Sequence, residues 1–215
     1  MKIYFIRHAQ SEGNISSVEH HDGVSLSEEG KKQAEFLANR ISSLPIDVIV
    51  CSTYGRTQET AEIINKKIGK NIILNDFLVE RKVPSSIIGK HSRSTEVLDI
   101  YNLLRQNFKK IDARHSDEEN FEDLSKRAGE ALNFIKSQPY ENILVVTHGS
   151  FSRVLLARMI FGENITGHEF ASIHRSFDSS NTGITVVEHK IPESDLQNEW
   201  VIKVWNDHAH LGEIK

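Results

Sequence analysis

The first fourteen residues, MKIYFIRHAQSEGN (residues 1–14), decide how the rest of the chain is interpreted. The run from Lys2 to Ile6 is mostly apolar and partly β-branched, which predicts a buried strand. It ends in Arg7 and His8, a permanent cation beside an imidazole. Ligands bind at the C-terminal ends of the strands in open α/β sheets. This end of the predicted strand is therefore a candidate binding site.

The same arrangement, an apolar run followed by charged or polar residues, occurs twice more. The run ILVV (143–146) is followed by Thr-His-Gly, which places His148 directly after a second predicted strand. The run IDVIVC (46–51) precedes a predicted helix that carries Arg56 near its start. Three predicted strands therefore present two histidines and two arginines at their ends.

Segments with helical periodicity alternate with these strands. A helix is expected from Ser27 to about Ile41, because Ser27 can cap it and its apolar residues repeat at helical spacing. Further helices are expected at 54–68, 121–137 and 151–161, a strand at 71–74, and an edge hairpin at 183–189 and 200–205. The alternation predicts an α/β fold, a three-layer α/β/α sandwich with a mainly parallel sheet.

Two stretches depart from this alternation. The polar stretch 11–25 is expected to be a loop. The stretch 77–120 is too long for a simple connection, and it contains an amphipathic run at about 96–108. We expect a single domain over 1–215, with a helical insertion at 77–120 that roofs the site and determines specificity together with the loop 15–25.

Three blocks of the chain carry a resemblance to a known family. RHAQSEGN resembles the signature of the histidine phosphatase superfamily, the phosphoglycerate-mutase-like proteins, with Ala9 where the family usually has glycine. CSTYGRTQET and VTHGS resemble the family's second and last blocks, in the same order. The resemblance spans nearly the whole chain. It implies a phosphoglycerate-mutase-like fold with Arg7, Asn14, Arg56 and His148 as phosphate ligands.

Composition limits the class of protein. The 215 residues are 38% hydrophobic and 26% charged, with a net charge of −4, so no basic face for nucleic acid is expected. Cys51 is the single cysteine, which leaves no internal disulfide, and we expect it to be a core thiol. No apolar run reaches ~18 residues, so no membrane partner is expected and a cytoplasmic location is the simplest interpretation.

Arginines and histidines that converge on strand ends form a pocket suited to a tetrahedral dianion. Guanidinium groups bind phosphate oxygens in pairs and keep their charge. An imidazole can attack phosphorus and form a phosphohistidine, and His8 is the candidate nucleophile. Gln10, Ser11 and Asn14 follow it as neutral donors. The helix that begins near Gly149 presents amide groups that favour anions.

The leaving alcohol needs a proton, and Glu80 is the candidate donor. It follows the strand at 71–74, in the sequence FLVERK, and resembles the glutamate that precedes an arginine in the family. It would act first as acid and then as base for the attacking water. The alternative is a solvated loop carboxylate paired with Arg81 or Lys82.

The first interpretation on these grounds is a metal-independent phosphatase that acts on small phosphorylated metabolites. The second interpretation is a cofactor-dependent phosphoglycerate mutase, although Gly13 stands where the mutases usually carry tryptophan and the tyrosine-glycine after their glutamate-arginine is absent. The third is a non-catalytic phosphate-binding regulatory module. The fourth is a metal-dependent hydrolase built on the same histidines, His8 and His148. His20, His21 and Asp22 could also suggest a metal site, but they lie in a polar stretch without a companion ligand pair at zinc spacing.

No Gly-rich nucleotide loop occurs in the sequence, so no cofactor is expected. The oligomeric state is left open. The edge hairpin around Trp200 is the surface on which a dimer would form by pairing with another subunit.

Overall fold

The computed structural model describes every residue except 21, 109, 111, 192, 194–198 and 213–215. Its described strands form one sheet in the order β3-β2-β4-β1-β5-β6. The strands are β1 (Lys2–Arg7), β2 (Val48–Cys51), β3 (Ile72–Leu74), β4 (Asn142–Thr147), β5 (Ile184–His189) and β6 (Trp200–Asp207). The first four in this order pair in parallel, and the β5–β6 hairpin adds two antiparallel pairings at one edge. The predicted mainly parallel sheet and edge hairpin are confirmed.

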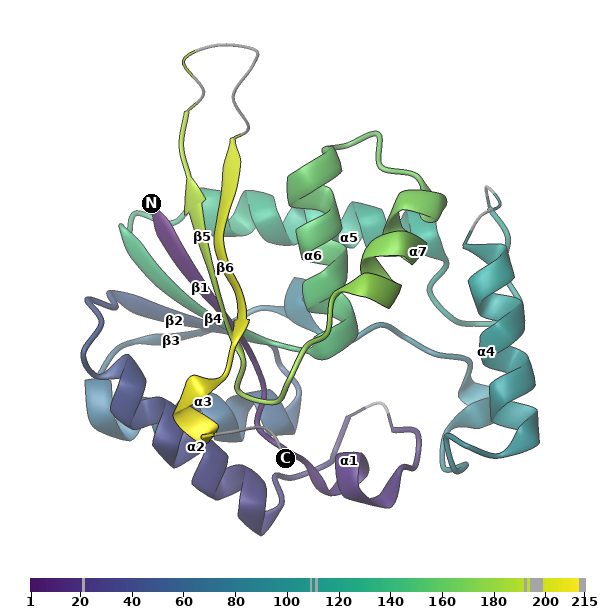
Figure 1. Ribbon diagram of the computed structural model, residues 1–215, viewed down its shortest axis with the longest axis horizontal. Helices are drawn as coiled ribbons and strands as arrows, with labels where there is room; N and C mark the ends of the chain where they lie inside the picture. Colours follow the sequence, from purple (N-terminus) through teal and green to yellow (C-terminus); the bar gives the residue numbers. More distant parts are fainter. Residues whose placement is uncertain (21, 109, 111, 192, 194–198, 213–215) are drawn as a thin grey trace.

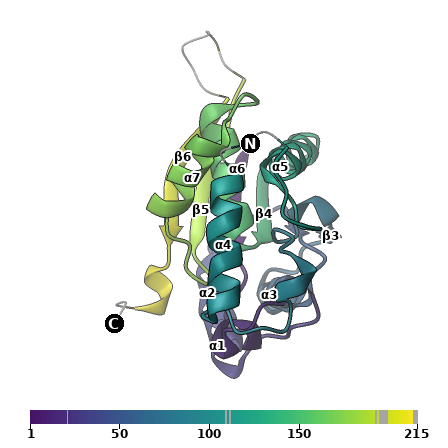
Figure 2. The same cartoon turned by 90° about the vertical axis from the view of Figure 1, so that its right-hand side faces the viewer.

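Helices cover both faces of this sheet (Figures 1 and 2). One face carries α2 (Glu28–Ile41) and α3 (Gly55–Ile68), and the other carries α5 (Phe121–Lys136) and α6 (Gly149–Phe161). A further helix, α7 (Gly167–Ser176), packs against α6. The three-layer α/β/α arrangement is therefore confirmed.

The alternation of side chains along the central strands explains why their sequences are almost wholly apolar. In β1, Ile3 and Phe5 pack into the core beneath α5 and α6, whereas Tyr4 and Ile6 pack beneath α2 and α3. Successive side chains of a strand point to opposite faces, so a strand covered on both sides has no polar face. Cys51 is one of these buried residues, and burial raises the pKa of its thiol to about 12.

The register of the parallel pairs aligns the three strand ends that the sequence singled out. Arg7 lies opposite Thr147 in the β1–β4 pair, and Cys51 lies opposite Val146 in the β2–β4 pair. The residue after each strand therefore emerges at the same edge of the sheet. These residues are His8, His148 and Ser52.

Two helices were not predicted. The stretch 11–25 was expected to be a loop, but it contains α1 (Glu12–Ser16), and the stretch after α6 contains α7. Both begin with a reciprocal capping box, formed by Ser11 with Asn14 and by Thr166 with Glu169. The expectation of a loop at 11–25 was wrong. A helix of 5 residues has no room for an apolar stripe, so only its capping box indicates a helix there.

The stretch 77–120 contains α4 (Thr95–Asn107), which matches the predicted amphipathic run, and α4 stands apart from the sheet (Figure 1). Short 3-10 helices lie at Asp76–Leu78, Ser85–Ile87 and Ala209–Leu211. None of the helices in the described ranges is long and apolar enough to cross a membrane.

A prediction concerns Gly30, where α2 crosses closely over the loop that follows β1. A Cβ at this position would lie 1.9 Å from the carbonyl oxygen of Gln10. That carbonyl is fixed because it accepts hydrogen bonds from the backbone and hydroxyl of Ser27. We expect Gly30→Ala to lower the free energy of unfolding by about 1–3 kcal/mol through overpacking, measured by urea denaturation.

The matched control is Gly55→Ala at the start of α3, where a Cβ would meet no atom within 4 Å. This variant should be as stable as the wild type or slightly more stable, since alanine favours helix. Equal stability of the two variants would contradict the packing argument.

Candidate active site

His8 and His148 lie side by side at the C-terminal edge of the sheet. Their rings are 5.2 Å apart between centroids and meet edge to face. Both side chains are buried, although imidazole is polar. The two rings are neighbours because β1 and β4 end in register and each histidine is the first residue after its strand.

The hydrogen bonds of His8 define which nitrogen can react. Nδ1 lies 2.7 Å from the carbonyl oxygen of Ala9, which can only accept, so Nδ1 carries the proton. Nε2 accepts a hydrogen bond of 3.2 Å from Nε of Arg56 and therefore holds the lone pair. Burial, and then the charges of Arg56 and Arg7, lower the pKa of His8 well below its ordinary value. The ring is thus neutral near pH 7.

His148 is the second imidazole of the site. Its Nε2 lies 2.9 Å from the hydroxyl oxygen of Ser52, and its ring meets Tyr54 edge to face at 5.2 Å. Its Nδ1 is buried without a partner among the described residues. Burial and then the charge of a protonated His8 lower the pKa of His148 well below its ordinary value. An anionic ligand would supply the missing partner and stabilise the protonated ring.

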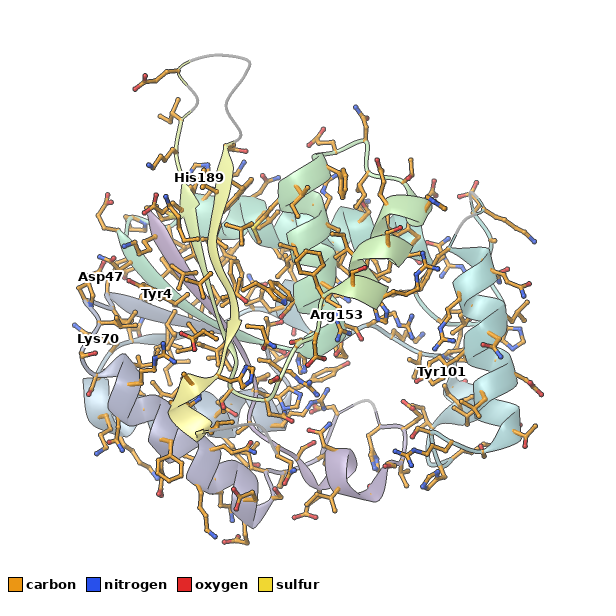
Figure 3. The ribbon with its side chains drawn as sticks, viewed as in Figure 1. Tyr4, Asp47, Lys70, Tyr101, Arg153 and His189 are labelled. Carbon is orange, nitrogen blue, oxygen red and sulfur yellow. The ribbon has the colours of Figure 1, made fainter. Side chains whose placement is uncertain are left out.

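Arg7 and Arg56 act electrostatically on both histidines, and Arg153 acts on Arg7. Arg7 ends β1, Arg56 lies in the first turn of α3, and Arg153 lies in α6 at the end near the site (Figure 3). Arg7 donates to the carbonyl oxygen of Ser179, but its Nε is buried without a partner among the described residues. Arg56 also stacks on the ring of Tyr54, with its guanidinium carbon 5.1 Å from the ring centre.

Gly149 makes room for one of these arginines. A Cβ on this residue would lie 3.2 Å from Nε and 3.3 Å from Cζ of Arg7. Such contacts are tighter than ordinary packing, so a side chain here would push the guanidinium out of place. Gly149, which was predicted to bind phosphate, therefore leaves room for the guanidinium of Arg7 through its lack of a side chain.

Glu80 occupies the start of α6, where the sequence suggested a place for the ligand. Its Oε1 accepts from the backbone N–H of Phe151 at 2.9 Å and of Arg81 at 2.9 Å. Its Oε2 accepts from the N–H of Ser150 at 3.1 Å. The carboxylate is thus held by three amides, and it is not a solvated loop group paired with the side chain of Arg81 or Lys82.

The negative charge of Glu80 acts on two arginines of the site, Arg7 and Arg56. It is the largest influence opposing the effect of burial on the pKa values of both Arg7 and Arg56. The carboxylate therefore lies within electrostatic range of the two guanidiniums that flank His8. This arrangement places a carboxylate beside two largely buried guanidiniums.

Three further predicted ligands have local partners in this structure. Ser11 caps α1, and its hydroxyl and backbone bond with Asn14. Gln10 turns toward α2, where its side-chain oxygen accepts from the hydroxyl of Ser27 at 2.9 Å. Asn14 is exposed, and its Oδ1 accepts from Ser11 and, at 3.4 Å, from Nδ2 of Asn181. Asn181 links Asn14 to the backbone of His8, because its Nδ2 also donates to the carbonyl oxygen of His8.

Sequence reasoning did not single out four residues of the site: Ser52, Tyr54, Arg153 and Asn181. Ser52 and Tyr54 lie inside the block CSTYGRTQET, so the sequence indicated their segment but not the residues themselves. Arg153 follows His148 by little more than one helical turn, which is a usable signal. Asn181 donates to the carbonyl oxygen of His8 at 2.8 Å from a loop that carries no motif.

In the described part of the chain, no three His, Cys, Asp or Glu side chains gather as they would around a metal ion. His21 lies outside the described residues. Asp22 instead accepts a hydrogen bond of 3.1 Å from the backbone N–H of Gly55.

Comparisons with known proteins agree with this arrangement. The family model of the histidine phosphatase superfamily (branch 1) matches residues 3–208. A probable phosphoglycerate mutase, GpmB of Cronobacter sakazakii, is 28% identical over 214 residues, which cover 98% of this chain and 95% of that protein.

Solved structures share the fold across almost the whole chain. A putative α-ribazole-5'-P phosphatase from Escherichia coli superimposes with a TM-score of 0.79 at 22% identity, covering 97% of each chain. A mycobacterial glucosyl-3-phosphoglycerate phosphatase superimposes with a TM-score of 0.76 at 19% identity, covering 95% of this chain and 98% of that one. The family model covers nearly the whole chain, and the chain belongs to the histidine phosphatase superfamily.

Proposed function

We propose that this protein is a metal-independent phosphatase that hydrolyses small phosphomonoesters through a phosphohistidine on His8. The observation that carries the proposal is the state of the His8 ring. It is buried, its pKa is lowered, and its Nε2 lone pair faces the guanidinium of Arg56. A neutral imidazole beside fixed cations combines a nucleophile with a binding site for the anion that it attacks.

In the first step, Nε2 of His8 attacks phosphorus and the bond from phosphorus to the leaving oxygen breaks. That oxygen takes a proton from Glu80 and departs as an alcohol. The ring becomes positively charged as the N–P bond forms, and the hydrogen bond from Nδ1 to the carbonyl oxygen of Ala9 stabilises this charge. Arg7, Arg56 and His148 bind the phosphoryl oxygens.

In the second step, water attacks phosphorus and gives a proton to the Glu80 carboxylate. The N–P bond breaks, phosphate leaves and His8 returns to its neutral form. The three backbone amides that hold Glu80 fix its orientation through both steps. In this proposal, the segment 77–120 covers the site, and the whole chain forms one domain.

A phosphoglycerate mutase is the second candidate, because the curated relative described above is named a probable phosphoglycerate mutase. The mutase would use the same phosphohistidine and return the phosphoryl group to its substrate. The two activities separate in one assay. Incubation with 3-phosphoglycerate yields inorganic phosphate from a phosphatase and 2-phosphoglycerate from a mutase.

The test of the proposed function is phosphate release from p-nitrophenyl phosphate with EDTA present. We expect the wild type to remain active in chelator, and His8→Ala to lose at least ~10³-fold in kcat, because the nucleophile is gone. Loss of wild-type activity in EDTA, restored by added metal, would favour the metal-dependent hydrolase. No turnover of this ester or of a panel of phosphorylated metabolites would favour the non-catalytic module.

A second prediction isolates the role of Glu80. A p-nitrophenolate leaves readily without a proton, whereas an alkoxide does not. We expect Glu80→Gln to lower kcat/KM for an alkyl phosphate by ~10²–10⁴-fold and to lower it much less for p-nitrophenyl phosphate. The control is Asp178→Asn, an exposed carboxylate beside Arg153 that should affect both substrates alike. Equal losses in kcat/KM for the two esters in Glu80→Gln would contradict the role of Glu80 as general acid.

A third prediction concerns pH. The pKa of His8 is lowered in the folded protein, so below pH ~6.5 the unfolded chain binds a proton that the folded chain does not. His8 therefore makes stability fall as pH drops below about 6.5, and its effect is absent above that range. We expect the free energy of unfolding of His8→Asn to decline less steeply from pH 7 to pH 5 than that of the wild type, measured by urea denaturation. Parallel slopes would contradict a neutral buried His8.

A further inference from the structure

The backbone that carries Glu80 is bound by one side chain of α5, that of Arg127. Nη1 of Arg127 donates to the carbonyl oxygens of Phe77 at 3.0 Å and Val79 at 2.7 Å. Its Nη2 donates to the carbonyl oxygen of Glu80 at 3.4 Å. This segment belongs to no strand of the described sheet, so its carbonyl groups lack strand partners. A side chain that is distant in sequence supplies their donors instead.

Glu119 binds the remaining N–H groups of this arginine. Its Oε1 accepts from Nε of Arg127 at 2.7 Å, and its Oε2 accepts from Nη2 at 2.7 Å. A guanidinium carries five N–H groups, and Arg127 makes five hydrogen bonds. The two side chains are largely buried, with exposed fractions of 13% and 18%. Complete hydrogen bonding compensates the loss of hydration that such a pair incurs.

The same carboxylate also binds the backbone on the far side of Glu80. Oε2 of Glu119 accepts from the N–H of Lys82 at 2.9 Å, and the N–H of Glu119 donates to the carbonyl oxygen of Lys82 at 3.1 Å. Arg127 therefore holds the chain up to Glu80, and Glu119 holds it just beyond. These contacts close the base of the insertion 77–120, because they join its first residues to its last.

Phe151 connects the ion pair to the carboxylate of Glu80. The guanidinium carbon of Arg127 lies 4.1 Å from the ring centre of Phe151, which is fully buried. The backbone N–H of Phe151 donates to Oε1 of Glu80 at 2.9 Å. One residue of α6 thus supports Arg127 with its ring and Glu80 with its amide.

We propose that Arg127 and Glu119 are positioning residues for Glu80. Their ion pair fixes the path of the backbone at 77–82, so that the Glu80 carboxylate meets the amides of α6 and faces the leaving oxygen. The inference rests on the proposed function, because Glu80 protonates that oxygen there. It adds that the acid step depends on two side chains that bind the backbone. A change of conformation within the insertion would leave Glu80 in place, since the pair closes the insertion at its base.

The test begins with Arg127→Lys, which keeps the positive charge. The charge matters because, after burial and the charges of His8 and Arg56, that of Arg127 also lowers the pKa of His148. Lysine has three donors on one nitrogen and cannot replace the planar guanidinium. We expect kcat/KM for an alkyl phosphate to fall ~10–10²-fold, and that for p-nitrophenyl phosphate to fall less than about threefold. This ratio reports the steps up to departure of the alcohol, in which Glu80 is the acid.

A double variant connects the effect to Glu80. Once Glu80→Gln has removed the acid, Arg127→Lys has nothing left to position. In that background we expect Arg127→Lys to lower kcat/KM for the alkyl phosphate by less than about threefold. Urea denaturation checks that each variant folds. If Arg127→Lys does not, Glu119→Gln takes its place, because it keeps the size of the side chain but loses its charge and one acceptor oxygen.

The matched control is Lys136→Gln in the last turn of the same helix, where Lys136 pairs with Glu199 at 3.1 Å. It removes an ion pair of α5 that has no contact with the segment 77–82 among those described, and it should affect the two esters alike. A selective loss in this control, equal losses for the two esters in Arg127→Lys, or additive losses in the double variant would each overturn the inference.

The same assays separate the inference from the proposed function. A loss specific to the alkyl phosphate in Glu80→Gln but not in Arg127→Lys would overturn the positioning role and leave the phosphatase with Glu80 as its acid. No turnover of either ester by the wild type would contradict the phosphatase, and the positioning role would fall with it.

Discussion

The parallel pairing of β1 with β4 is the constraint on which the site depends. Because Arg7 lies opposite Thr147, the two residues that follow, His8 and His148, emerge together at one edge of the sheet. A shift of one residue would turn each side chain of β1 to the opposite face and separate the two rings. The apolar residues on both faces of β1 fix this register, since each face packs against its own helical layer.

Burial creates the chemistry at this edge. Removing imidazole and guanidinium groups from water costs free energy, and the lowered pKa values of His8, His148 and Arg7 reflect that cost. Packing of the surrounding helical layers compensates for this free-energy cost. As a result, Nδ1 of His148 and Nε of Arg7 are buried at this edge without a hydrogen-bond partner among the described residues. The same residues in water would attract an anion less strongly.

The sequence predicted the parts of the site that depend on strands. His8, His148 and Arg56 each stand at or near the end of an apolar run, and such runs are legible without a structure. Gln10 and Ser11 were harder to assign, because the sequence does not show that they bond to α2 and α1. Loop conformation depends on partners that are distant in the chain.

The same limit applies to Glu80 and to the secondary structure around it. FLVERK marked an acidic residue, but only the fold shows that it takes the amides at the start of α6. Capping boxes begin α1 and α7 and lie in the sequence, yet the short α1 lacks the periodic apolar face that distinguishes a helix from a loop. Tertiary contacts decide such segments.

The position of Glu80 also bears on how the pocket would empty. The amides of Ser150 and Phe151 at the start of α6 are already engaged by an internal carboxylate, so free phosphate would be retained mainly by side-chain cations. Glu80 shares Arg7 and Arg56 with that phosphate, and once Glu80 has lost to solvent the proton that it took from water, the two negative charges repel. In the proposed reaction, this repulsion favours rapid escape of the product and weak inhibition by it.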